Sequence, residues 1–169
     1  IEGVPESQQL MIRATYQGAN YHSPLSFDSA GKAHLEMEVF EATSSMKDIQ
    51  VAGSQMAFQI VGEHLQAVET LIFNNATKPP RVFVHPEGTF RLSKAPEILE
   101  PPKIRVTAPG TTLPLVQAAL ESADGQSYFS LYPLRPGMTT FEVQQTFPYA
   151  DRTFTYVKKF YQDIEPINI

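Results

Sequence analysis

The sequence predicts an all-β protein, built as an antiparallel β-sandwich of the immunoglobulin-like or a related type. Apolar Leu35 and Met37 alternate with Glu36 and Glu38, and segment 141–147 repeats the pattern. Such a period of two gives a strand one buried and one wet face. The apolar runs are also short, are stopped by Pro, Gly or Asn, and show no alternation of strands with helices. This spacing is typical of a sandwich and not of a parallel sheet.

The expected strands follow one another along nearly the whole chain. They cover residues 9–16, 21–27, 32–41, 50–51, 56–61, 65–74, 81–84, 89–92, 104–106, 113–120, 127–132, 139–146 and 153–160. Segment 113–122 has a helical alternative, because Leu115, Ala118 and Ser122 also fall on one helical face. We favour a strand there, since the segment is short and an Asp-Gly turn follows it.

The breaks between these strands have identifiable turn chemistry. Three of the breaks contain residues that accept the positive φ of tight turns. They are segment 17–20, with Gly18 and Asn20, segment 28–31, and the pair Asp124-Gly125. Pro136-Gly137 predicts a type II turn in which Gly137 takes positive φ. Gly53-Ser54 is interpreted as a further turn.

Segment 93–103 is the best candidate for a domain boundary or crossover. It contains Pro96, Pro101 and Pro102, and proline cannot donate a hydrogen bond to a strand ladder. We therefore expect an N-terminal β-sandwich part over 1–95 and a C-terminal β part over 96–169, packed as two sandwiches. One larger sandwich is the alternative, because 169 residues of which 42% are hydrophobic can bury a single sizeable core.

The composition excludes several classes of partner and chemistry. A net charge of -5 argues against a nucleic-acid surface, which needs clustered cations, and we interpret Lys158-Lys159 as a solvated strand end. The chain has no cysteine, so disulfides and thiolate chemistry are excluded. No apolar run approaches the roughly 18 to 20 residues that span a bilayer. We expect membrane contact only through segments outside this chain, such as a removed signal peptide or an anchor.

Residue types used in catalysis are present, but no catalytic motif joins them. The chain contains no Gly-x-Ser-x-Gly elbow, no phosphate-binding glycine loop and no His-Glu-x-x-His pattern. The candidate metal ligands are His22, His34, His64 and His85, and the candidate glycosidase carboxylates are Glu36, Glu38, Glu63 and Glu69. We interpret Glu36 and Glu38 as a wet strand face, His34 as pointing outward, and His85 as a neutral, hydrogen-bonded imidazole. The sequence thus predicts no catalytic residue, no metal site and no cofactor, and it assigns no ligand-binding residue.

Aromatic residues are concentrated in the last third of the chain, which contains no Trp. They are Tyr128, Phe129, Tyr132, Phe147, Tyr149, Phe154, Tyr156, Phe160 and Tyr161. We interpret them as core, because Phe and Tyr fit a pleated sheet and bury large areas. A platform on which sugars stack is the alternative.

Several segments of the chain resemble a known family. Segments 10–22 (LMIRATYQGANYH), 37–43 (MEVFEAT), 131–139 (LYPLRPGMT) and 147–149 (FPY) resemble bacterial envelope proteins named for a carboxypeptidase regulatory-like domain. In these proteins a small regulatory-like β-sandwich is commonly followed by a segment of this kind and often by a membrane anchor. The resemblance implies an exported segment without peptidase activity, and it supplies no functional residue.

We therefore expect a non-catalytic structural or interaction module of a bacterial cell-envelope protein, periplasmic or extracellular and membrane-anchored in the full-length protein. Its expected partner is a protein or a glycan of the envelope. The alternatives are a carbohydrate-binding module and, third, a hydrolase whose site is assembled from distant residues. An exposed row of Tyr side chains would favour the second of these functions, and a cleft joining a His to two carboxylates the third.

Overall fold

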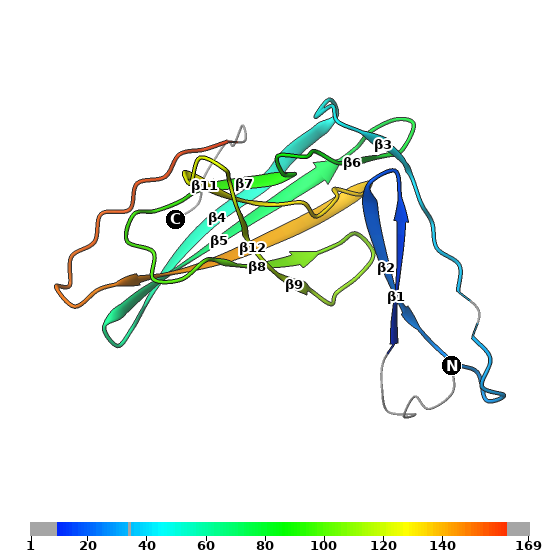
Figure 1. Cartoon of the computed structure of the whole chain (residues 1–169), viewed down its shortest axis with the longest axis horizontal. Helices are drawn as coiled ribbons and strands as arrows, with labels where there is room; N and C mark the ends of the chain where they lie inside the picture. The colour runs from blue at the N-terminus through cyan, green and yellow to red at the C-terminus, as the bar shows by residue number, and fades with distance from the viewer. Residues whose placement is uncertain (1–9, 34, 162–169) are drawn as a thin grey trace.

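A computed structural model describes residues 10–33 and 35–161 and confirms the all-β class (Figure 1). No helix is found in that part of the chain. The strands are β1 (Leu10–Tyr16), β2 (Ala19–Leu25), β3 (Glu41–Thr43), β4 (Ile49–Val61), β5 (His64–Asn75), β6 (Arg81–Phe83), β7 (Phe90–Ser93), β8 (Lys103–Thr107), β9 (Leu115–Ala118), β10 (Leu120–Glu121), β11 (Ser127–Ser130) and β12 (Gly137–Pro148).

Two antiparallel sheets form the body of the molecule. The larger has the strand order β4-β5-β12-β8-β9, and the smaller has the order β10-β11-β7. Only Ala119 separates β9 from β10, so the chain itself joins the two sheets along one side. On the opposite side each sheet ends in a free edge, β4 in the larger and β7 in the smaller. The sandwich is therefore closed on one side and open on the other.

The main hydrophobic core lies between these sheets. Phe141 of β12 pairs with Leu71 of β5 and Val106 of β8, and all three side chains are almost completely buried. The smaller sheet covers them with Phe90 of β7, whose ring stacks on Phe141 at 4.9 Å between centroids, and with buried Tyr128 of β11. The sandwich class predicted from the alternation is thus confirmed, while the immunoglobulin-like subtype stays a prediction.

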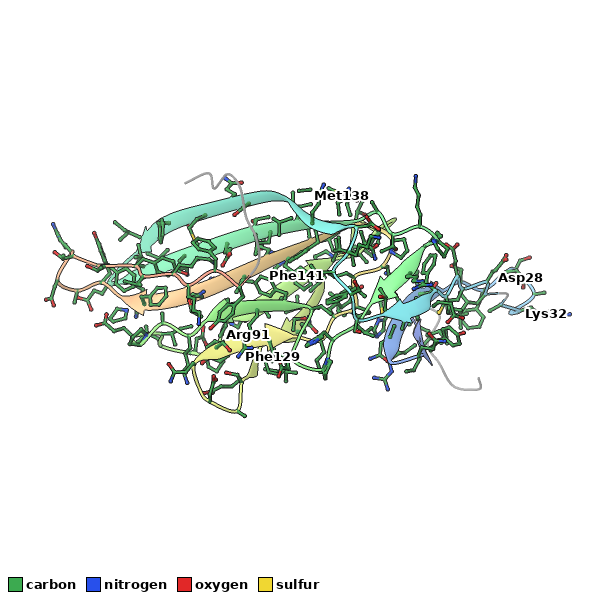
Figure 2. The ribbon with its side chains drawn as sticks, turned by 90° about the horizontal axis from the view of Figure 1, so that it is seen from above. Asp28, Lys32, Arg91, Phe129, Met138 and Phe141 are labelled. Carbon is green, nitrogen blue, oxygen red and sulfur yellow. The ribbon has the colours of Figure 1, made fainter. Side chains whose placement is uncertain are left out.

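A smaller unit with its own core lies at the N-terminal end (Figure 1). It consists of the β1–β2 hairpin and the parallel pair β3–β6. Ala19, Tyr21 and Val82 form its buried centre, and the Tyr21 hydroxyl accepts a hydrogen bond from the Phe40 amide at 3.1 Å. The turn between Asp28 and Lys32 lies at the far tip of this end (Figure 2).

The predicted boundary at 95/96 falls between strands of one sheet. β4 and β5 precede it, and β8, β9 and β12 follow it, yet all five pair in the larger sheet. The alternative of one larger sandwich accommodates this pairing. The division into 1–95 and 96–169 itself stays a prediction. Segment 93–103 is, as expected, a crossover: between Ser93, the last residue of β7, and Lys103, the first of β8, a loop carries the chain from one sheet to the other.

Two of the predicted strands are wrong. In segment 32–41 only Glu41 belongs to a strand, and segment 153–160 contains none. Both segments keep an alternation of half-buried and exposed residues where they are described. The alternation reports which side of an extended chain is covered, but a strand also needs a neighbour for hydrogen bonding, and these segments have none within the described residues. His34 lies outside the described residues, so its predicted orientation is untested.

Other predictions concern single turns and breaks. The segments 50–51 and 56–61 belong to one long strand, β4, so the turn predicted at Gly53-Ser54 is wrong, and the strand has a β-bulge between Val51 and Gly53. The strand preferred over a helix at 113–122 is confirmed as β9 and β10. Gly137 has φ +100°, which confirms the predicted left-handed conformation.

Candidate functional site

The open side of the sandwich is filled by residues 151–161, which we call the C-terminal strap. After β12 the chain turns back through 149–152, and the strap runs back along the sandwich (orange to red in Figure 1). The Tyr149 amide donates to the Glu63 carbonyl at 2.7 Å, and the Arg152 amide donates to the Tyr149 carbonyl at 3.2 Å. Arg152 has φ +56°, a left-handed conformation that costs a non-glycine residue roughly 1 kcal/mol or more. The hinge of the strap is therefore tight and strained.

The strap turns alternate side chains toward the sandwich. Phe154, Tyr156 and Lys158 are half-buried, whereas Val157 between them is 77% exposed. Phe154 packs against the fully buried Phe147 of β12 at 4.7 Å between ring centroids, and Tyr156 meets Phe58 of β4 edge-on at 5.6 Å. The strap thus closes the second hydrophobic cluster of the protein, which also contains Met56, Leu65 and Ala67.

A buried ion pair anchors the strap to the larger sheet. Glu69 of β5 forms a salt bridge with Lys158, and the two side chains are only 3% and 11% exposed. A buried charge is costly unless an opposite charge neutralises it, so each partner depends on the other. Lys158 is therefore not a solvated residue, and the interpretation of that half of the Lys158-Lys159 pair is wrong.

Tyr156 and Gln145 extend this polar contact. The Gln145 amide nitrogen lies 3.5 Å from the Tyr156 hydroxyl. Burial, with a smaller contribution from the negative charge of Glu69, raises the pKa of Tyr156 to about 12. The phenol therefore stays neutral at physiological pH. Together, Glu69, Gln145, Tyr156 and Lys158 form a polar anchor beside Phe147 of β12, whose ring lies 5.8 Å from that of Tyr156.

The far end of the strap reaches the free edge of the smaller sheet. The Lys159 amide donates to the Ser93 hydroxyl of β7 at 3.3 Å, and the Arg91 guanidinium lies over the Tyr161 ring at 5.0 Å from its centroid. Arg91 also donates to the Ser127 hydroxyl of β11 at 2.7 Å, and Figure 2 shows it beside Phe129 on this sheet. The strap therefore bridges the β4 and β7 edges.

Two hollows flank the end of the strap. One, of about 580 Å³, is lined by Gln50, His85, Glu87, Arg91 and Tyr161 among others. The second, of about 530 Å³, is lined by Arg91, Lys94, Asp124, Gln126, Lys159 and Tyr161 among others. Both bring hydrogen-bonding side chains to the ring of Tyr161. Glu87 is the one carboxylate among the described residues that line the first hollow.

The other candidate residues of the sequence are scattered. His22 is in β2, where burial and the charges of Arg13 and Arg135 lower its pKa, and His64 is the first residue of β5. His85 accepts a hydrogen bond from the Glu87 amide through Nδ1 at 3.2 Å, in agreement with the hydrogen-bonded imidazole that we expected. Within residues 10–33 and 35–161 no three His, Cys, Asp or Glu side chains gather in a metal-binding arrangement.

The candidate carboxylates fall into two groups. Glu36, Glu38 and Glu63 are exposed, as interpreted for the first two, but Glu36 and Glu38 lie in an irregular segment and not on a strand. Glu69 is instead the buried partner of Lys158. Sequence reasoning did not find this pair, although a signal was present. Glu69 is the single charged residue in the alternating set Leu65, Ala67, Glu69, Leu71 and Phe73, and Lys158 continues the set Phe154 and Tyr156.

The aromatic residues of the last third divide between core and surface. Tyr128, Tyr132 and Phe147 are buried, as predicted for core residues, whereas Phe160 is exposed. Phe154 and Tyr156, which belong to the strap, are half-buried against the second hydrophobic cluster. The row of exposed Tyr side chains that would favour a sugar platform is not formed by the described residues of this region.

Comparisons with known proteins found no matching family model, no matching curated protein and no matching solved structure. The described residues also contain no helix long and apolar enough to cross a membrane.

Proposed function

We propose that this chain is a non-catalytic structural or interaction module of a bacterial cell-envelope protein, acting by holding an extended segment on the open side of its sandwich. One observation carries the proposal: the strap lies between the β4 and β7 edges and inserts every second side chain. Extended peptides bound at sheet edges gain their specificity from pockets for alternate side chains, and the strap uses this feature without a main-chain ladder among the described residues. The envelope location and the resemblance to regulatory-like domain proteins are part of the same proposal.

The chemistry of the groove supports binding of a segment with defined side chains. Its apolar part, with Phe147 at its centre, takes aromatic rings, and Glu69 takes a cation four residues beyond the first ring. A buried carboxylate discriminates strongly, because a segment without the cation would leave Glu69 unpaired. The expected ligand is thus an extended peptide with an aromatic-x-aromatic-x-cation pattern.

The experiment uses a reversible lock on the strap. Because the chain has no cysteine, Ser93→Cys with Lys159→Cys introduces a single disulfide across the contact that joins the strap to β7. We expect a displayed library of eleven-residue peptides to yield binders of the 169-residue chain. Binding should fall at least tenfold when the two thiols are oxidised to the disulfide and return when the disulfide is reduced. Binders indifferent to the lock, or no binders at all, would contradict the proposal.

The location is tested separately by fractionating source cells and detecting the protein with a specific antibody. We expect the protein in the periplasmic or membrane fraction. Its recovery with cytoplasmic markers would contradict the envelope part of the proposal and leave the groove part standing.

A carbohydrate-binding module is the second candidate, favoured by the hollow that combines the Tyr161 ring with Gln50, His85, Glu87 and Arg91. Sugars bind to such combinations of a ring face and hydrogen-bonding side chains. A glycan array probed with the full chain and with Gln50→Ala tests it. Selective retention of a glycan that Gln50→Ala loses would place this candidate first.

A further inference from the structure

The groove under the strap is matched to a sequence that the chain itself contains. The pattern Phe-x-Tyr-x-Lys occurs at 154–158 and nowhere else in the chain. Its three side chains make the contacts with Phe147, Phe58 and Glu69 described above. Any second copy of the protein carries an identical segment. A copy is therefore a partner that meets the steric and charge requirements of the groove without further adaptation.

The strap is held by side chains and not by a ladder of main-chain hydrogen bonds. In the described part of the chain, residues 153–160 belong to no strand, and the main-chain contact between the strap and a sheet edge is the one from the Lys159 amide to Ser93. Release therefore breaks no sheet. When the same segment enters a second copy, its rings and its cation meet the same groups that they left in the first.

The hinge favours release. Residues 149–152 reverse the chain within a few residues, and Arg152 is held at φ +56° to do so. Short hinges under strain promote exchange of an identical element between copies, because the extended hinge of the exchanged form relieves the strain. The Glu69–Lys158 pair opposes an empty groove, because release leaves Glu69 buried without a cation, and the Lys158 of a second copy restores the pair.

We propose that the occupant of the groove in trans is the C-terminal strap of a second copy, so that two molecules join by reciprocal strap exchange. The inference rests on the proposed function, since it names the partner of the same groove. Phe154 and Tyr156 of one copy would pack on Phe147 of the other, and Lys158 would pair with Glu69 across the two copies.

The experiment follows the exchange by cross-linking two variants of the 169-residue chain. One carries Ser93→Cys and the other, fused to a tag of different mass, carries Lys159→Cys. The two variants are mixed in a glutathione buffer, at protein concentrations at which the parent protein shows dimer by light scattering. We expect a disulfide to form between them, giving a product whose mass lies between those of the untagged and the tagged disulfide-linked homodimers. A control mixture replaces Ser93→Cys with Gln55→Cys, which places the thiol on the exposed outer face of β4. The mixed product of the control should be at least tenfold less abundant.

Adding Lys158→Met to the Lys159→Cys chain tests the role of the charge. We expect the mixed product to fall at least fivefold, while circular dichroism of the variant keeps the β signature of the parent. The chain that carries both Ser93→Cys and Lys159→Cys first shows that the two thiols can join within one molecule. If they do, an amount of mixed product no higher than in the Gln55→Cys control would overturn the exchange. If peptide binding is at the same time sensitive to that lock, the proposed function stands and only the identity of the partner is wrong.

Discussion

The two halves of the inner face of the larger sheet are covered in different ways. At one half, Leu71, Phe73, Phe141 and Val143 lie under the smaller sheet, and the contacts are apolar. At the other half, Leu65, Ala67 and Phe147 lie under the strap, and a buried Glu69–Lys158 pair stands among them.

The two kinds of cover differ in how much they depend on particular side chains. An apolar cover that is part of a hydrogen-bonded sheet stabilises the fold in proportion to the apolar area that it buries, and other apolar side chains that pack well can replace its own. A single extended segment held by two rings and one cation depends on particular side chains at particular positions. The half under the smaller sheet therefore stabilises the fold, while the half under the strap is the one to which we assign the proposed recognition of a segment.

The largest expected effect compares one aromatic ring from each half. Phe141→Ala removes a fully buried ring that contacts Phe73 and Phe90, so we expect a loss of about 3 to 5 kcal/mol in the free energy of unfolding. Phe154→Ala removes a half-buried ring, so its loss should be roughly half as large. Urea unfolding of the two variants measures both values. An equal loss would mean that the strap is as integral to the fold as the smaller sheet.

The second prediction concerns the ion pair. Lys158→Met leaves Glu69 buried without its cation, which costs at most about 3 to 5 kcal/mol, and less if the strap lifts and lets water reach the carboxylate. Replacing both partners, with Glu69→Leu and Lys158→Met, should restore stability to near that of the parent. Urea unfolding of the single and double variants measures the coupling. A double variant as unstable as Lys158→Met would show that the cost is one of packing and not of charge.

The third prediction tests the half under the smaller sheet at the start of β12. Gly137 has φ +100°, and a Cβ there would lie 3.2 Å from Cβ of Pro109, so Gly137→Val should destabilise by at least about 1 kcal/mol. Glu36→Gln, in an exposed irregular segment, is the control and should stay within about 0.5 kcal/mol of the parent. Equal midpoints in urea would contradict the conformational cost assigned to Gly137.

The smallest effect is the pH dependence that Tyr156 contributes in the strap half. The pKa of Tyr156 is about 12 in the folded protein against an ordinary value of 10.0, so the folded state binds the proton more tightly than the unfolded chain. Its contribution to stability is fully present below pH 10 and is lost as the pH rises from 10 toward 12. Tyr156→Phe removes this dependence, so its thermal midpoint should fall less than that of the parent between pH 9 and pH 11. Identical slopes for the two proteins would contradict the burial of the phenol.

Local pattern was sufficient for much of the fold and for little of the site. Period-two alternation located strands such as β1, β5 and β12, and turn chemistry identified the positive φ of Gly137, because both signals act between residues close in the chain. The same alternation failed at 153–160, where an extended segment is half-buried without a strand partner. Pairing Glu69 with Lys158 needed a contact between residues far apart in the chain, which no local pattern encodes.

The amino-acid sequence by itself determined the all-β class, turns such as the one at Gly137, and which side chains of each extended segment share a face, since these follow from the geometry of neighbouring residues. Only the tertiary structure decided which faces are covered and by what. Phe141 of β12 is buried because β7 and β11 of the smaller sheet pack over it. Lys158 looks like a surface cation in the sequence, but it is the buried partner of Glu69 because the strap returns across the open side of the sandwich. The physical reason is that desolvation and charge pairing depend on distances through space, which the chain sets when its distant segments pack.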